Sequence, residues 1–239
     1  MKAIILAAGR GSRMKKLTNE IPKCLIKLDG KTLLDRQIES LKAAGIIEIG
    51  IVTGYRRELL INRGLTEFHN ARWFETNMVY SLFCVDEWLN SEPCIVCYSD
   101  LFYEPMGVFS LIENSSDLAI TYDPNWLELW TSRFGDPLVD AETFLIDENS
   151  FITEIGNRPD SLDQVNGQYM GLLRFTPSGW QEVVSFLNTL TTKEFDHIHM
   201  TGTLQMLIQT KKTKIKAIPY HGEWGEFDSL KDLETFSSE

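Results

Sequence analysis

The residues best suited to chemistry lie near the start of the chain, where a short apolar run leads into Leu6-Ala7-Ala8-Gly9-Arg10-Gly11-Ser12-Arg13-Met14. Small residues let backbone N–H groups approach a phosphate or the edge of a base, and Arg13 can bind two phosphate oxygens at once. The segment is not a P-loop, because no Gly-Lys-Ser/Thr follows it. Met14 also stands where a dinucleotide fingerprint needs its third glycine. The pattern predicts a loop that binds a small anion.

A second basic feature follows at Pro22-Lys23, which leads directly into the apolar run from Cys24 to Leu28. Proline restricts the backbone, so a lysine held there at the mouth of a sheet is well placed to neutralise a phosphate. Residues 1–30 carry seven basic and two acidic side chains, a net charge of +5, whereas the whole chain of 239 residues carries −11. This distribution argues against a general nucleic-acid binder and favours a small anionic ligand.

Apolar runs of strand length alternate with segments of helical period, which is typical of a mainly parallel sheet with crossover helices. We expect an α/β fold with strands at 2–6, 48–52, 71–74, 93–98, 118–122 and 214–218. Helices are expected at 32–44, 56–63, 79–89, 105–113, 177–190 and 200–210, and from Leu230 onward.

After residue 123 the alternation of strands and helices gives way to shorter strand-like segments at 142–146, 151–155 and 169–175. We interpret residues 123–175 as a small β-rich insertion that forms an acceptor lid on a single domain spanning 1–239.

Cys94 and Cys97 fall within one apolar strand and face opposite sides of it, so we expect neither a zinc site nor a redox site there.

The segment LAAGRGSRM followed by LTNEIPKCLIKLDGKTLLDRQIESL resembles the nucleotidyltransferase family, which activates phosphorylated compounds as nucleoside diphosphate derivatives. Further matches are IVTGY at 51–55, TNMVYSL at 76–82, YSD ending at Asp100 and EFD ending at Asp228. The resemblance implies a Rossmann-like domain with a mixed, mostly parallel sheet. It implies nucleotide contacts from Leu6, Ala8, Gly9, Gly11, Ser12, Arg13, Lys23, Asn77, Ser81 and Asp100.

The same resemblance implies that Asp100 and Asp228 bind Mg²⁺, and that Arg13 and Lys23 are the catalytic residues. Each aspartate follows an apolar strand or turn, so the two are expected to meet at the carboxyl ends of the sheet strands beside a triphosphate. Two alternatives stay open. Asp100 would otherwise be a solvated loop carboxylate, and Asp228 would otherwise cap the last helix, since aspartate is favoured at that position.

The insertion resembles cytidylyltransferases that act on phosphocholine, aminoalkylphosphonates and related precursors, through WLELWTSRF at 126–134 and GQYMGL at 167–172. Aromatic rings beside carboxylates suit an ammonium group, and Arg133 suits a phosphate, phosphonate or carboxylate. The expected acceptor contacts are Trp126, Trp130, Arg133, Glu142 and Tyr169. The alternative is that the three aromatic residues are core of the lid.

These observations predict a Mg²⁺-dependent cytidylyltransferase that joins CMP from CTP to a small phosphate- or phosphonate-bearing acceptor and releases pyrophosphate. The resemblance implies a role in surface polysaccharide, capsule or phosphonate modification. The expected partners are CTP and the acceptor, with neither nucleic acid nor membrane, and the oligomeric state stays open. We expect a cytoplasmic protein, because no apolar run reaches transmembrane length and the first one is too short for a signal peptide.

Three other functions stay open on the sequence. A sugar 1-phosphate uridylyltransferase or thymidylyltransferase would share the first thirty residues. A nucleotide-binding regulatory protein without catalysis would keep the loop but release no pyrophosphate. A Rossmann oxidoreductase would bind NAD, which the departure from the dinucleotide fingerprint argues against.

Overall fold

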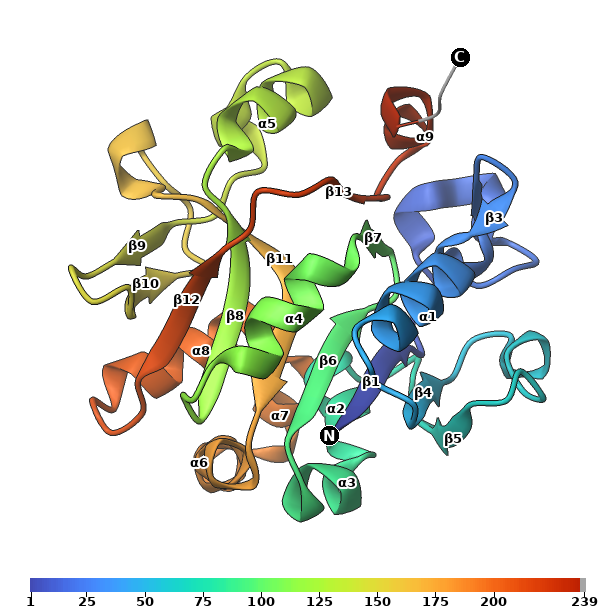
Figure 1. Cartoon of the computed structure of the whole chain (residues 1–239), viewed down its shortest axis with the longest axis horizontal. Coiled ribbons are helices and arrows are strands. Elements are labelled where there is room, and N and C mark those ends of the chain that lie inside the picture. The colour runs from blue at the N-terminus through green and yellow to red at the C-terminus, as the bar shows by residue number, and fades with distance from the viewer. Residues whose placement is uncertain (237–239) are drawn as a thin grey trace.

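A seven-stranded sheet forms the centre of the molecule in this computed structural model (Figure 1). The structure describes residues 1–236, except the side chains of Arg13, Lys15, Lys16 and Leu230. The strand order is β12-β8-β11-β6-β1-β4-β5. β11 runs antiparallel to both of its neighbours, and the other neighbouring pairs are parallel. The predicted mixed, mostly parallel α/β sheet is therefore confirmed. The strands are β1 Lys2–Ala7, β4 Ile49–Thr53, β5 Thr66–His69, β6 Cys94–Tyr98, β8 Leu118–Asp123, β11 Gln168–Phe175 and β12 Ile215–Pro219.

Helices cover both faces of this sheet (Figure 1). Side chains alternate along β1, so Ile5 packs with Leu41 in one core and Ile4 packs with Leu82 in the other. This two-sided burial explains why β1 is an uninterrupted apolar run. One face carries α1 Leu33–Ala43 and α4 Pro105–Glu113, and the other carries α2 Met78–Phe83, α3 Asp86–Ser91, α6 Pro177–Leu187, α7 Thr192–His197 and α8 Met200–Gln209.

Three predicted elements between residues 56 and 89 differ from the structure. The expected helix at 56–63 is only a 3-10 turn, η3 Arg57–Leu59, because Arg56 before it and Asn62 after it adopt positive φ angles of 50° and 63°. The expected strand at 71–74 is a turn, and β5 precedes it. The expected helix at 79–89 is divided into α2 and α3, since the backbone leaves helical geometry at Val85.

The predicted β-rich lid over 123–175 is corrected at its end. This stretch begins with α5 Trp126–Phe134, and β9 Phe144–Ile146 and β10 Ile152–Ile155 form a separate antiparallel ribbon. β11, however, lies between β8 and β6 in the central sheet. Seven of its eight residues are buried, as expected for an interior strand rather than part of a surface lid.

Short elements complete the edge of the sheet at which the strands β1 and β6 end. β7 Leu101–Tyr103 pairs with β13 Trp224–Glu226, and the backbone N–H of Phe227 donates to the carbonyl oxygen of Asp100 at 3.0 Å. The last helix is α9 Leu230–Phe236. The remaining elements are β2 Lys27–Leu28, β3 Lys31–Thr32, and the 3-10 turns η1 Ser12–Thr18, η2 Lys23–Leu25, η4 Pro137–Val139 and η5 Leu162–Gln164.

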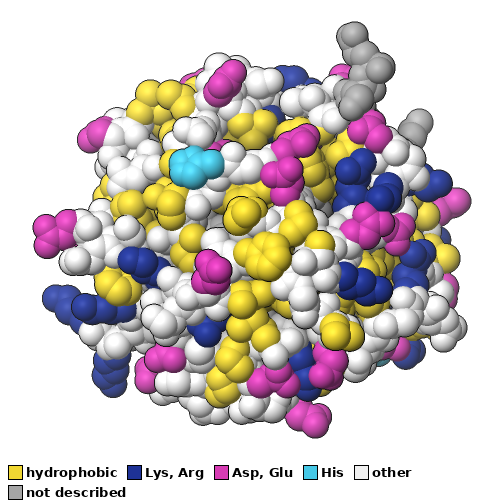
Figure 2. Space-filling view, viewed as in Figure 1, with side chains coloured by type: hydrophobic (Ala, Val, Ile, Leu, Met, Phe, Trp, Pro, Cys, Tyr) yellow, Lys and Arg dark blue, Asp and Glu magenta, His cyan; other side chains and the backbone are white. Residues whose placement is uncertain are grey.

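Hydrophobic side chains gather near the centre of the face on which α4 lies (Figure 2). Met106 and Phe109 of this helix are 63% and 39% exposed.

Within the part of the chain that the structure describes, no helix has both the length and the apolar character needed to span a bilayer.

Candidate active site

The loops that follow β1 and β6 leave the sheet at the same edge. These strands are parallel neighbours with Leu6 opposite Tyr98, so residues 8–11 and residues 99–100 emerge side by side. Between them lies a cavity of about 200 Å³, which we call the loop cavity. Its walls are Leu6, Ala8, Gly9, Gly11, Lys23, Trp73, Thr76, Asn77, Met78, Ser81, Tyr98, Ser99 and Asp100.

Gly11 makes room for the side chain of Lys23. Gly11 has a φ angle of +68°, and a Cβ atom at this position would lie 3.0 Å from both Cβ and Cδ of Lys23. Lys23 begins η2 directly after Pro22, which adopts an extended conformation with φ −61°. A glycine and a proline, both earlier in the chain than the lysine, thus fix where its buried stem runs.

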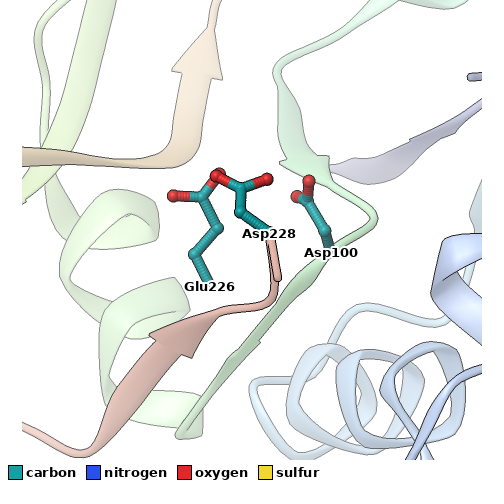
Figure 3. Close-up of side chains that lie close together, drawn as sticks. All are labelled: Asp100, Glu226 and Asp228. Carbon is teal, nitrogen blue, oxygen red and sulfur yellow. The ribbon is translucent and has the colours of Figure 1, made fainter. Parts of the chain in front are cut away.

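Three carboxylates converge near the carboxyl end of β6 (Figure 3). Asp100 follows β6, Glu226 ends β13, and Asp228 lies two residues further on. One oxygen from each lies within 4.8 Å of the others. The Nζ atom of Lys23 donates to Oδ2 of Asp100 at 2.7 Å and to Oδ1 of Asp228 at 2.6 Å.

This cluster has the donor set of a divalent cation site. The Oδ1 atom of Asp100 is buried and has no hydrogen-bond partner among the described residues, so it can accept a cation. Carboxylate oxygens are the ligands that Mg²⁺ prefers. The sequence reasoning missed Glu226, although residues i and i+2 of a strand share a face, and the fully buried Phe227 lies between Glu226 and Asp228.

A second cavity of about 530 Å³, which we call the acidic cavity, adjoins the first. The two cavities share Met78, Tyr98 and Asp100. Five carboxylate side chains line the acidic cavity, and none of its described lining residues is a lysine or an arginine. The carboxylates are Asp100, Asp140, Glu142, Glu226 and Asp228.

The expected acceptor residues divide into two groups. Trp130, Glu142 and Tyr169 line the acidic cavity, and the Tyr169 ring meets the Tyr98 ring edge to face at 5.8 Å. Trp126 and Arg133 are not among its lining residues. Trp126 is 4% exposed and packs edge to face against Trp130, as a core residue would.

Arg133 lies in a different place from the one we expected. Its side chain is 1% exposed, and Nε donates to Oδ1 of Asp232 in α9 at 2.8 Å. Oδ2 of Asp232 in turn accepts hydrogen bonds from the backbone N–H groups of Asp228 and Ser229. Arg133 therefore supports the turn that carries Asp228 instead of lining the acidic cavity.

The expected nucleotide residues are brought together with two exceptions. Ser12 is exposed and does not line the loop cavity, and the side chain of Arg13 lies outside the described part of the structure. Asn77 caps α2 by accepting from the N–H of Met78, and its Nδ2 lies 3.0 Å from Nδ1 of His199, which lines the acidic cavity.

Two polar residues that the sequence reasoning missed hold the turn before α2. Asn70 is fully buried there, and Arg72 forms a two-point ion pair with Asp196 of α7 at 3.1 and 2.6 Å. The sequence offered only weak signals for them, because asparagine in a turn is common and the partner of Arg72 lies 124 residues away.

Comparisons with known proteins place this site in a family. A family model described as a MobA-like NTP transferase domain matches residues 3–133, which is more than half of the chain. The chain is also 38% identical, over 98% of its length and 98% of the relative, to a CTP:phosphoglutamine cytidylyltransferase of Campylobacter jejuni. The chain belongs to the MobA-like NTP transferase family.

Two further comparisons agree with this family assignment. A choline-phosphate cytidylyltransferase of Streptococcus pneumoniae is 40% identical over 43% of this chain and 46% of that protein. The inositol-1-phosphate CTP transferase of T. maritima shares the fold, with a TM-score of 0.74, 23% identity, and coverage of 97% of this chain and 90% of that one. The predicted nucleotidyltransferase class, and its resemblance to cytidylyltransferases, are confirmed.

The electrostatics of this candidate site follow from burial and from the closeness of its charged groups. Burial alone would lower the pKa of Lys23, but the charges of Asp100 and Asp228 outweigh it and hold the pKa above its usual value. Burial, and then the negative charges of Asp228 and Asp100, raises the pKa of Glu226 to about 8. The arrangement therefore combines a permanently charged ammonium group with a cluster of carboxylates that a bound cation would stabilise.

Proposed function

We propose that this protein is a Mg²⁺-dependent cytidylyltransferase that transfers CMP from CTP to a small phosphorylated acceptor carrying an ammonium group, such as a phosphorylated amino acid. The observation that carries the proposal is the meeting of two cavities at Asp100, with Lys23 beside it. One cavity has the small-residue walls that a nucleotide needs, and the other is lined by carboxylates. A relative that matches 98% of this chain is named for CTP and phosphoglutamine, which supports this pairing of substrates.

The reaction we propose is an in-line displacement. A phosphate oxygen of the acceptor attacks the α-phosphorus of CTP, a new P–O bond forms, and the bond to the bridging oxygen of the β-phosphate breaks with release of pyrophosphate. Positioning and charge neutralisation dominate such steps. No covalent bond to the protein and no proton transfer is required, so the reaction needs no activated nucleophile on the protein.

Lys23 and the β1 loop are the protein groups we assign to the triphosphate. The ammonium group of Lys23 stands between the two cavities, where negative charge grows on the leaving pyrophosphate. Gly9 and Gly11 present backbone without a side chain to the loop cavity, which allows phosphate oxygens to approach closely. Arg13 is assigned to the same phosphates on the basis of the sequence alone.

Asp100, Glu226 and Asp228 are the residues we assign to Mg²⁺. Their geometry fits the ion, because the oxygens converge and Oδ1 of Asp100 lacks another partner among the described residues. A bound Mg²⁺ would neutralise charge on the phosphate oxygens and align them. Lys23 would then donate to phosphate instead of to the carboxylates it contacts here.

The acceptor is assigned by charge. Asp140 and Glu142 lie in the acidic cavity together with the rings of Trp130 and Tyr169, and carboxylates with aromatic rings attract an ammonium group. Burial raises the pKa of Glu142, so this partly dehydrated carboxylate would gain from a cationic partner. The product, an acceptor joined to CMP through a diphosphate, is an activated donor of the kind that surface polysaccharide modification consumes.

The proposal is tested by product identification. The purified protein is incubated with Mg²⁺, CTP and phosphoglutamine or phosphocholine, and the mixture is analysed by mass spectrometry and for pyrophosphate. We expect one CMP adduct and one pyrophosphate per turnover, both abolished by EDTA and restored by added Mg²⁺. CTP binding without either product, across phosphorylated amino acids, phosphocholine and aminoalkylphosphonates, would instead support a nucleotide-binding protein without catalysis.

A further inference from the structure

Gln168 is the first residue of β11, and its side chain belongs to the wall of the acidic cavity. The residue is 4% exposed, so its amide group is largely withdrawn from bulk water. Burying an amide group is costly unless its oxygen and its nitrogen find hydrogen-bond partners. The partners of these two atoms therefore decide what Gln168 can offer to a ligand in the cavity.

The backbone on both sides of Gln168 holds it in this wall. A Cβ atom at Gly167 would lie 2.8 Å from the carbonyl oxygen of Asp123, so glycine is needed for the chain to enter β11 this close to β8. The register between the two strands then shifts, and Gly171 adopts a φ angle of +77°. This irregularity interrupts the alternation of a regular strand, and residues 168–171 all line the acidic cavity.

The orientation of the Gln168 amide group is fixed by a backbone carbonyl. Its Nε2 atom donates to the carbonyl oxygen of Glu142 at 3.0 Å, and a carbonyl oxygen can only accept. The nitrogen therefore faces this carbonyl group, and Oε1 points elsewhere. An amide oxygen carries no proton, so Oε1 can only accept a hydrogen bond.

Oε1 of Gln168 is left without a partner on the side of the cavity. Among the described residues it forms no hydrogen bond, and unlike Oδ1 of Asp100 it is not enclosed by the protein, so it opens onto the acidic cavity. Glu142 adds a carboxylate to the same wall, and Oε1 of this carboxylate accepts from the Thr201 hydroxyl at 3.4 Å. This part of the cavity thus presents oxygen atoms that accept hydrogen bonds, and the ligand must supply the donors.

We propose that Gln168 is a specificity-determining residue, which accepts a hydrogen bond from the acceptor substrate and selects a primary ammonium group over a quaternary one. A primary ammonium group carries three N–H donors, which match the amide oxygen of Gln168 and the carboxylate of Glu142. A trimethylammonium group has the same charge but no N–H, so it would cover the amide oxygen without giving it a partner. The inference rests on the proposed function in one respect, which is that the acidic cavity holds the cationic group of the acceptor substrate.

Phosphoethanolamine and phosphocholine test this directly, because they differ only in the three methyl groups that replace the three N–H hydrogens. With the wild-type protein, CTP and Mg²⁺, we expect kcat/KM for phosphoethanolamine to exceed that for phosphocholine about 100-fold. If neither compound is turned over, their inhibition constants against phosphoglutamine give the same comparison. This measurement needs no variant, so it does not depend on the folding of a substituted protein.

Gln168→Met separates hydrogen bonding from size. Methionine has a similar length and volume but no amide oxygen, so the preference for phosphoethanolamine should fall about tenfold through a higher KM for this compound. KM for CTP should stay unchanged, because Gln168 lines only the acidic cavity. The matched control is Gln205→Met, at a glutamine that is also hydrogen-bonded to the backbone but lines neither cavity, and it should keep the wild-type preference.

The outcomes separate the inference from the proposed function. Equal kcat/KM values for phosphoethanolamine and phosphocholine in the wild type would overturn the inference and leave the proposed function standing. A folded Gln168→Met variant that keeps the wild-type preference would also overturn it, because the preference would then come from the size of the methyl groups. A wild-type protein that forms no CMP adduct with any ammonium-bearing acceptor, phosphoglutamine included, would remove the proposed function and the inference with it.

Discussion

The two cavities that meet at Asp100 are built from the chain in opposite ways. The loop cavity comes mostly from residues 6–23 and 73–81, with glycine, alanine and short polar side chains in its walls. The acidic cavity collects residues from many stretches between 78 and 228, and carboxylates and aromatic rings are prominent in its walls. A phosphate site made of backbone needs little chain, whereas a site for a charged organic group needs side chains gathered from several elements.

The largest expected effect is at the residue that both cavities share. Asp100→Asn should lower kcat at least about 10³-fold, because it removes a charge that we assign to the metal and that Lys23 contacts. Steady-state pyrophosphate release at saturating CTP and acceptor measures it. The matched control is Asp163→Asn, at an exposed position away from both cavities, which should retain full activity. A retained rate in Asp100→Asn would mean that the cavities do not meet at the reacting atoms.

Lys23→Ala tests the lysine that lies beside both cavities. We expect kcat to fall about 10²- to 10³-fold with a smaller change in KM for CTP, since we assign the ammonium group to the charge that grows on the leaving pyrophosphate. Lys27→Ala, at an exposed position four residues further on, is the control. A variant that binds CTP poorly but turns over normally would assign Lys23 to ground-state binding only.

Arg133→Met tests the support behind the acidic cavity. It leaves the buried Asp232 without its cationic partner and should lower the free energy of unfolding by about 3 kcal/mol, measured by urea denaturation. The double variant Arg133→Met, Asp232→Leu should lose less than the sum of the single losses, because the two residues are coupled. Unchanged stability with a raised KM for the acceptor would restore Arg133 to the acceptor role that the sequence suggested.

Glu142→Gln separates the two cavities most cleanly. We expect KM for an ammonium-bearing acceptor to rise about tenfold, since a charge-assisted contact is worth roughly 1.5–3 kcal/mol when fully formed. KM for CTP should stay unchanged, because Glu142 lines only the acidic cavity. Equal effects on both substrates would show that the acidic cavity contributes to nucleotide binding as well.

The pH dependence of stability tests the carboxylate cluster in the absence of substrate. In metal-free protein, Glu226 faces Asp100, Asp228, Lys23 and Arg133, and its pKa is raised to about 8. Between the usual glutamate pKa and pH 8 the folded state holds a proton that the unfolded state has lost, so the free energy of unfolding falls as pH rises. The slope is at most about 1.4 kcal/mol per pH unit. Urea denaturation of the wild-type protein in EDTA should show this slope, and Glu226→Gln should reduce it. Equal slopes in the two proteins would mean that Glu226 is not the source of the pH dependence.

The sequence predicted best what depends on neighbouring residues. The range of α4, Pro105–Glu113, was predicted to the residue, because proline favours the first turn of a helix. The β1 loop and Lys23 were recognised because glycines, basic residues and a proline lie close together in the chain. The residue pattern failed at 71–74, where the hydrogen bonds of Asn70 form a turn despite the strand-like composition.

The acidic side of the site depends on contacts between distant segments, which a single sequence does not show. Arg133 was expected to bind an anion because a guanidinium suits a phosphate, phosphonate or carboxylate, whereas here α9 covers it and supplies Asp232 from 99 residues away. Glu226 reaches the carboxylate cluster only because β13 pairs with β7, a strand more than 100 residues earlier in the chain. The sequence suggested carboxylates and aromatic rings for this side, and the fold decides which of them line the cavity.

The most direct test of the account is a matrix of initial rates of pyrophosphate release. CTP, UTP, dTTP, ATP and GTP are each combined with Mg²⁺ and phosphoglutamine, phosphocholine, 2-aminoethylphosphonate or glucose 1-phosphate. We expect turnover confined to CTP and to acceptors that bear an ammonium group. Turnover with UTP or dTTP and glucose 1-phosphate would contradict it, since the carboxylates of the acidic cavity would then not have the role assigned to them.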